Sequence, residues 1–115
     1  MSFDPFRSTG RTTRMIEKAN KYREENPEAV IYIVGHTYRY ASELARQVPG
    51  SVPIGSGESE RLRGVVGKAF VDRAFWERHL VSVRDRENMY YALNMLAART
   101  SGRLVHDKGV NQDEI

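Results

Sequence analysis

Hydrophobic side chains recur along the chain with two different spacings, which indicates that helices and strands alternate. Over residues 13–25 apolar side chains return every three or four positions, and this helical run ends at Asn26-Pro27 because the residue before a proline avoids the helical region. The same spacing predicts a helix over residues 38–48, ended by Pro49-Gly50. The clearest amphipathic helix is predicted over residues 84–99.

Two segments have the composition of strands. Residues 29–34 form a continuous β-branched and aromatic run ended by Gly35, which predicts a central strand covered on both faces. Residues 65–66 and 69–71 predict a second strand that ends at Asp72, followed by a helical or irregular segment.

Weaker strand signals complete the pattern. Residues 51–60 are rich in Ser, Gly and Pro, so we expect a loop in which Pro53 permits only a short or edge strand around residues 52–54. Residues 103–106 have the composition of a further short strand.

The alternating order predicts an α/β fold, with a small parallel or mixed sheet of three or four strands flanked by helices. The chain has 115 residues, enough for one domain spanning residues 1–115. Within it we expect an N-terminal arm over residues 1–9 and a frayed tail over residues 108–115.

Composition says more about the expected location and class of the protein than about its activity. The chain has no cysteine, which excludes disulfides, zinc–thiolate sites and a cysteine nucleophile. No apolar stretch is long enough to cross a membrane and the N-terminus lacks a signal-peptide pattern, so we expect a cytoplasmic protein with no membrane partner. A net charge of +3 identifies no partner by itself.

Positive charge is concentrated near the N-terminus. Between residues 7 and 23 there are six basic side chains against one acid, Glu17; the basic ones are Arg7, Arg11, Arg14, Lys18, Lys21 and Arg23. Such a cluster is typical either of a solvated helix face or of a surface that contacts phosphate or nucleic acid.

A turn of small residues opens directly onto the first predicted helix. Its candidate phosphate-binding residues are Ser8, Thr9, Gly10, Arg11, Thr12 and Thr13. Backbone N–H groups at a helix start lie beside the positive end of the helix dipole, and threonine hydroxyls add donors, so an anion is stabilised there. The structural alternative is an ordinary capped helix start.

This turn resembles the phosphate-binding loop of P-loop nucleotidases, whose pattern is Gly, four residues, Gly, Lys, then Ser or Thr. Gly10 matches the second glycine and Thr12 the magnesium-binding hydroxyl, whereas Arg11 replaces the lysine and Pro5 stands where the first glycine belongs. A P-loop normally follows a buried strand, and residues 1–7 are short and polar. The resemblance therefore implies a reduced architecture that binds phosphate better than it hydrolyses it.

The strand ending at Asp72 is similar to the second P-loop signature, an apolar strand that ends in a magnesium-associated aspartate. Together the two motifs resemble helicase-like and terminase-like ATPases and their small phage-encoded relatives. The resemblance implies that Thr12 and Asp72 hold Mg²⁺ with a nucleoside triphosphate. Arg73 replaces the water-activating carboxylate, a role that Glu58 or Glu60 would have to take. Structurally, Asp72 is also a candidate helix cap.

The alternative function is a noncatalytic accessory protein that retains the fold and binds a protein or a nucleic acid. Exposed aromatic side chains are expected because Tyr38, Tyr40, Tyr90 and Tyr91 cannot all point inward from their helices. An incomplete sheet would also favour a homodimer or docking onto a host protein. The scattered His36, His79 and His106 fit structural or surface roles better than a metal site.

Overall fold

The computed structural model describes residues 11–77 and 79–101. Its elements in chain order are α1 (Arg11–Glu25), β1 (Ile31–Val34), α2 (Tyr38–Ala45), β2 (Val52–Ile54), the 3-10 helix η1 (Ser59–Leu62), β3 (Lys68–Val71), the 3-10 helix η2 (Arg73–Trp76) and α3 (Val83–Ser101). The alternation of helices and strands that the hydrophobic pattern predicts is therefore confirmed.

The three described strands form a parallel sheet in the order β2-β1-β3. All four residues of β1 are buried, as expected for a central strand of a parallel sheet. Pro53 lies in β2, at the edge of the described sheet, where its missing N–H leaves no gap in a ladder. The fold is α/β with a parallel sheet, the simpler of the two arrangements that the sequence predicts.

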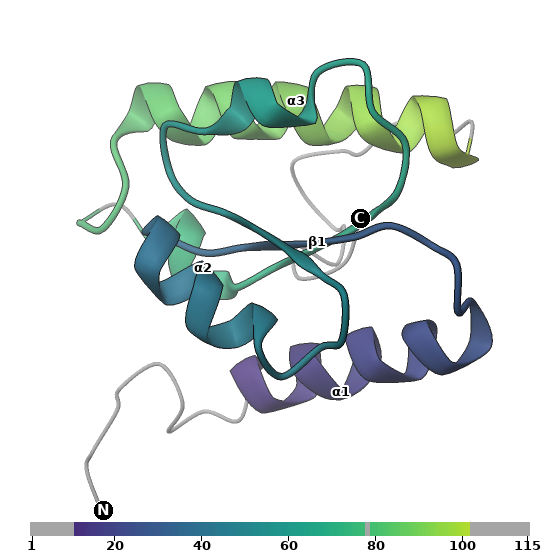
Figure 1. Cartoon of the computed structure of the whole chain (residues 1–115). Helices are drawn as coiled ribbons and strands as arrows, with labels where there is room; N and C mark the ends of the chain where they lie inside the picture. The colour runs from purple at the N-terminus through teal and green to yellow at the C-terminus, as the bar shows by residue number, and fades with distance from the viewer. Residues whose placement is uncertain (1–10, 78, 102–115) are drawn as a thin grey trace, which may run out of the picture.

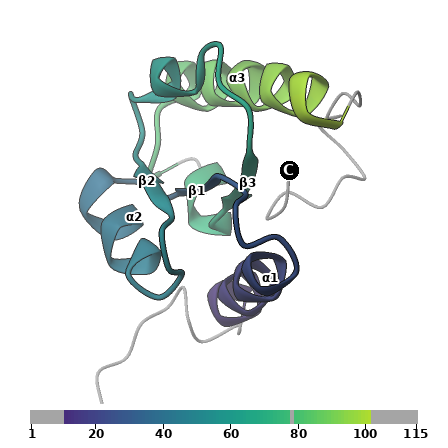
Figure 2. The ribbon, with the colours of Figure 1, turned by 45° about the vertical axis from the view of Figure 1, so that its right-hand side comes forward.

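Helices cover both faces of the sheet (Figures 1 and 2). On one face α1 and α2 pack on Ile31, Ile33 and Phe70. On the other face α3 and η1 pack on Tyr32, Val34 and neighbouring strand residues. The sequence periodicity predicts these faces because Met15 and Ala19 of α1, like Met89 and Leu93 of α3, are fully buried.

The third strand begins later than its hydrophobic pattern predicts. Val65 and Val66 precede β3, and Val66 is 56% exposed. Gly67 separates them from the strand with a φ of 153°, and a Cβ atom there would lie 2.7 Å from both the Tyr32 ring and the Val30 carbonyl oxygen. The prediction of strand structure at residues 65–66 is wrong because this close approach turns the chain into the sheet only at Lys68.

Several expectations concern residues outside the described part of the chain. These are the N-terminal arm at residues 1–9, the strand at residues 103–106 and the tail at residues 108–115. Among the helices that are described, none combines the length and apolar character needed to span a membrane.

Candidate functional site

The strands end level with one another, which creates a single edge where their following loops meet. Val34 is in register with both Ile54 and Val71, the last residues of the three strands. The chain leaves β1 toward α2 on one face of the sheet, and it leaves β3 toward η2 and α3 on the other. In open α/β sheets, ligands commonly bind where the connections from neighbouring strands diverge in this way, a place that we call the crevice.

A buried hydrogen bond connects α1 to this crevice. The Thr12 hydroxyl donates to Oδ1 of Asp72 over 2.8 Å, although the two residues are 60 positions apart in the sequence. Thr12 is 4% exposed and Asp72 is 1% exposed. The sequence motifs predict that these residues lie opposite each other, and their contact confirms that proximity.

Asp72 also has the capping role that its sequence position suggests. It is the N-cap of η2, and its Oδ2 accepts a hydrogen bond from the Ala74 N–H over 3.2 Å. Its own N–H donates to the Val34 carbonyl over 2.8 Å, which continues the sheet ladder. Both interpretations of Asp72 are thus compatible, because its two carboxylate oxygens have different partners.

Of the remaining predicted phosphate-binding residues, only some lie within the described part of the chain. Arg11 is the first described residue of α1, and Thr13 is exposed on the same first turn. Ser8, Thr9 and Gly10 lie outside the described residues. The structure therefore places Thr12 at the crevice with its hydroxyl directed to Asp72, and Thr13 at the adjoining surface.

The residues that follow β1 lie at the neighbouring strand end. Gly35 lies beside α2, where a Cβ atom would come within 3.0 Å of the Ala41 backbone nitrogen. His36 then packs its ring against Tyr40 with 4.6 Å between ring centroids. Thr37 caps α2 by accepting a hydrogen bond from the Tyr40 N–H. His36 thus lies one residue beyond the level of Asp72 on the neighbouring strand, and sequence spacing alone does not reveal that juxtaposition.

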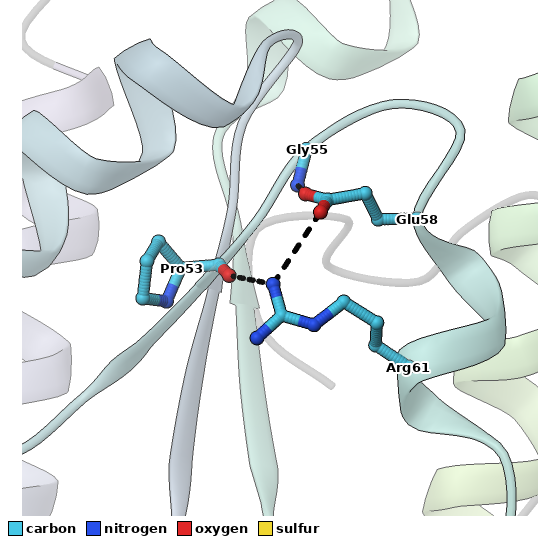
Figure 3. Close-up of polar contacts among 4 residues, drawn as sticks. All are labelled: Pro53, Gly55, Glu58 and Arg61. Carbon is cyan, nitrogen blue, oxygen red and sulfur yellow. Dashed lines mark hydrogen bonds and ion pairs between the residues drawn. The ribbon is translucent and has the colours of Figure 1, made fainter.

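The two glutamates considered for water activation have other surroundings. Glu58 accepts a hydrogen bond from the Gly55 N–H over 2.7 Å and lies 3.5 Å from Arg61, which also donates to the Pro53 carbonyl (Figure 3). These contacts hold the turn after β2, two strands away from β3. Two strand spacings amount to about 10 Å, so Glu58 stabilises its own turn instead of facing Asp72.

Glu60 lines a groove between η1 and α3. The groove has a volume of about 540 Å³, and its wall includes Leu62, Arg63, Tyr91 and Met95. Tyr91 is 69% exposed and Tyr38 is 52% exposed, which confirms that some aromatic side chains remain at the surface.

The chemistry available at the crevice is that of oxygen ligands. Mg²⁺ binds hard oxygen donors, commonly one or two carboxylates together with phosphates and water. Because the Thr12 hydroxyl donates a hydrogen bond to Asp72, the lone pairs of its oxygen remain available, and the pair offers oxygen donors of the type that Mg²⁺ prefers. Within the described residues there is no cluster of three or more His, Asp or Glu side chains that would bind a metal without such a ligand.

No family model, curated protein or solved structure matches the chain in the three comparisons made.

Proposed function

We propose that the chain binds a phosphate-bearing ligand, a nucleoside triphosphate with magnesium, at the start of α1. The observation that carries the proposal is the buried hydrogen bond between Thr12 and Asp72. It unites the two positions where the sequence resembles the P-loop signatures. It also lies at the sheet edge where connections diverge to opposite faces, which favours a ligand site.

Each residue has a distinct role in this proposal. The N–H groups at the start of α1 bind phosphate oxygens with help from the helix dipole, and the Arg11 guanidinium adds a positive charge. Thr12 and Asp72 hold the cation, which neutralises phosphate charge when bound. Because Asp72 also caps η2 by accepting a hydrogen bond from the Ala74 N–H, its carboxylate is held in a fixed orientation.

Hydrolysis is expected to be slow or absent. Efficient hydrolysis needs a carboxylate that orients and deprotonates the attacking water. Arg73 follows Asp72 directly and is exposed, and the carboxylate of Glu58 is engaged by Gly55 and Arg61. Ligand binding, with little turnover, is therefore the proposed activity.

Thermal unfolding with added ligand tests this proposal. Magnesium with ATP, GTP, ADP or inorganic phosphate is titrated at constant ionic strength, and each protein is compared with its own ligand-free Tm. Ligand at about 100 times its Kd stabilises by roughly 2.7 kcal/mol, which corresponds to roughly 10 °C in a domain of this size. Thr12→Val and Asp72→Asn are expected to abolish the shift caused by the nucleotide.

Thr100→Val is the matched control for the loss of a threonine hydrogen bond. Thr100 accepts a hydrogen bond from the Gly67 N–H over 3.0 Å, just before β3 and so at the amino end of the strands. Its substitution lowers the ligand-free Tm and leaves the nucleotide shift intact. Equilibrium dialysis with a radiolabelled nucleotide gives a second readout if a variant unfolds early. The absence of any nucleotide shift in the unsubstituted protein, or equal shifts in all variants, contradicts the proposal.

A further inference from the structure

All three described helices begin at the same edge of the sheet. Thr12 contacts Asp72 at the carboxyl end of β3, so the start of α1 lies there. The N-cap of α2 follows β1 closely, and Arg86 of α3 donates to the Trp76 carbonyl at the end of η2. In Figure 1 these three helix starts lie on the left-hand side, where β1 ends. We call this region the carboxyl edge.

Four elements that begin at the carboxyl edge have an exposed arginine in the first turn, whereas η1, which follows β2, has Glu58 as its N-cap and Glu60 in its first turn. The four arginines are Arg14 in α1, Arg39 in α2, Arg73 in η2 and Arg84 in α3. The first turns of α1, α2 and η2 contain no acidic residue, and that of α3 contains Asp85. Arg61 forms an ion pair with Glu58, and within the described part of the chain no ion pair involves any of the four arginines.

This arrangement opposes the ordinary electrostatics of helices. The N-terminus of a helix carries partial positive charge and favours acidic side chains, while the C-terminus favours basic ones. In α1 the order is reversed in net charge, because Arg14 lies in the first turn and the last turn contains Glu24 and Glu25 together with Arg23. Placing arginines against the dipole weakens the helices but adds their charge to that of the helix ends, which concentrates positive potential at one edge.

The arginines are too widely distributed for one small ligand. Arg14 and Arg39 belong to the helix layer on one face of the sheet, and Arg84 belongs to the layer on the other. A helix has a diameter of roughly 10 Å, so the two layers are separated by roughly 20 Å across the sheet. An extended anion with repeated charges matches that separation.

An exposed aromatic side chain lies among these charges. Tyr38 is the first residue of α2, next to Arg39, and it is 52% exposed. Aromatic rings beside basic groups stack on unpaired bases, whereas a duplex presents its bases already stacked. This combination distinguishes a single strand from other polyanions.

We propose that the carboxyl edge binds single-stranded nucleic acid, with the four arginines on successive phosphates and Tyr38 stacked on a base. This surface adjoins the proposed nucleotide site but uses different binding groups, since it requires neither Thr12 nor magnesium. Four phosphate contacts to a single strand give a slope of about −2.8 for log K against log salt concentration. The affinity therefore falls roughly 50-fold between about 50 and 200 mM salt.

Fluorescence anisotropy with the full chain measures this binding. The probe is a fluorescein-labelled oligothymidylate of about twenty nucleotides, without magnesium or nucleotide, titrated at several KCl concentrations. Arg39→Ala and Arg73→Ala are each expected to weaken binding and to reduce the salt slope by about 0.7. Tyr38→Ala lowers the affinity at least about fivefold and leaves the slope unchanged, because stacking releases no counterions.

Arg46→Ala is the matched control. Arg46 is an exposed arginine on α2 like Arg39, but it is the C-cap at the opposite end of the helix. Its substitution changes the net charge equally and leaves the slope nearly unchanged. Equal losses from Arg39→Ala and Arg46→Ala, tighter binding of duplex than of single strand, or a salt-independent affinity would overturn the proposal. Thr12→Val retains oligonucleotide binding, so failure here is separable from failure of the nucleotide site.

Discussion

Tyr32 is a buried ionisable side chain at the middle of the sheet. It lies in β1 and is 7% exposed, with its ring in the core beneath α3. Burial raises the pKa of the Tyr32 hydroxyl above its usual value of 10.0, and the nearby Arg99 guanidinium lowers that pKa in part. The neutral form of Tyr32 is therefore the one that the fold favours.

The raised pKa predicts a loss of stability in alkaline solution. In the unfolded chain Tyr32 loses its proton near pH 10, whereas in the fold it keeps the proton to a higher pH. Its contribution is complete below pH 10 and is lost as the pH rises through the folded-state pKa. In urea unfolding above about pH 9, Tyr32→Phe should show a shallower decline of the free energy of unfolding than the unsubstituted protein.

Tyr91→Phe is the control for this measurement, because Tyr91 remains 69% exposed in the fold. Its substitution should leave the alkaline decline unchanged. A decline of the same steepness in Tyr32→Phe and in the unsubstituted protein would contradict the assignment to Tyr32.

The proximity of two residues could be predicted where it depends on motif order. The two P-loop-like signatures predict that Thr12 and Asp72 approach each other, and their hydrogen bond confirms this. Binding of magnesium and nucleotide stays a prediction. The positions of His36 and Glu58 relative to Asp72 could not be predicted, because they depend on which strands are neighbours and the sequence does not specify the strand order.

At the scale of elements, one arginine holds the end of α1 to two loops. The Arg23 Nε donates to the Pro49 carbonyl over 2.9 Å, and Nη1 donates to the Pro27 and Ala29 carbonyls over 3.1 and 2.6 Å. The neighbouring Asn20 donates to the Gln47 carbonyl over 3.0 Å. These bonds join α1 to the segments that enter β1 and β2.

Substitution of Arg23 should therefore destabilise the whole fold. Arg23→Ala removes three charge-assisted hydrogen bonds at a partly exposed site, which is expected to lower the free energy of unfolding by about 1–3 kcal/mol. Arg23→Lys recovers only part of this because an ammonium lacks the planar fork that reaches several carbonyls. Urea denaturation measures both values.

Lys21→Ala provides the comparison, since Lys21 is exposed on the same helix. It should change the free energy of unfolding by less than about 0.5 kcal/mol. A similar loss in Lys21→Ala and Arg23→Ala would mean that helix propensity or net charge, and not the carbonyl contacts, explains the effect.

The hydrophobic pattern predicts the elements better than their connections. Periodicity identifies the buried faces of α1 and α3 because apolar spacing and burial have the same cause. It does not reveal that Arg23, which belongs to the predicted basic face, directs its guanidinium to loop carbonyls. It also does not reveal that Arg99 donates to the Val65 and Leu62 carbonyls, both over 2.7 Å. Such contacts depend on where distant loops pass.

At the scale of the whole molecule, the helix starts are more basic than the helix ends, where the charges are mixed. The helix starts at the carboxyl edge contain Arg14, Arg39 and Arg84 with one first-turn acid, Asp85, while Glu24 and Glu25 lie beside Arg23 at the other end of α1. A net charge of +3 does not express this difference. A surface with locally concentrated positive charge attracts and orients a polyanion before contact, which increases the rate of association at low salt.

Because this distribution opposes the helix dipole, the same substitution should have opposite effects on stability at the two ends of α2. Arg39→Glu places an acid in the first turn behind the Thr37 cap and is expected to raise the free energy of unfolding by about 0.5–1 kcal/mol. Arg46→Glu places the acid at the C-cap and is expected to lower it by a similar amount.

Urea denaturation at low ionic strength, together with oligonucleotide titration, tests whether Arg39 lowers the free energy of unfolding while it strengthens nucleic-acid binding. Arg39→Glu should give a more stable protein that binds a single strand more weakly, and Arg46→Glu a less stable protein whose salt slope is retained. Added salt should reduce both changes in stability, since screening weakens exposed charges. If Arg39→Glu instead destabilises the fold, Arg39 stabilises α2 itself, and its position in the first turn no longer supports a nucleic-acid surface.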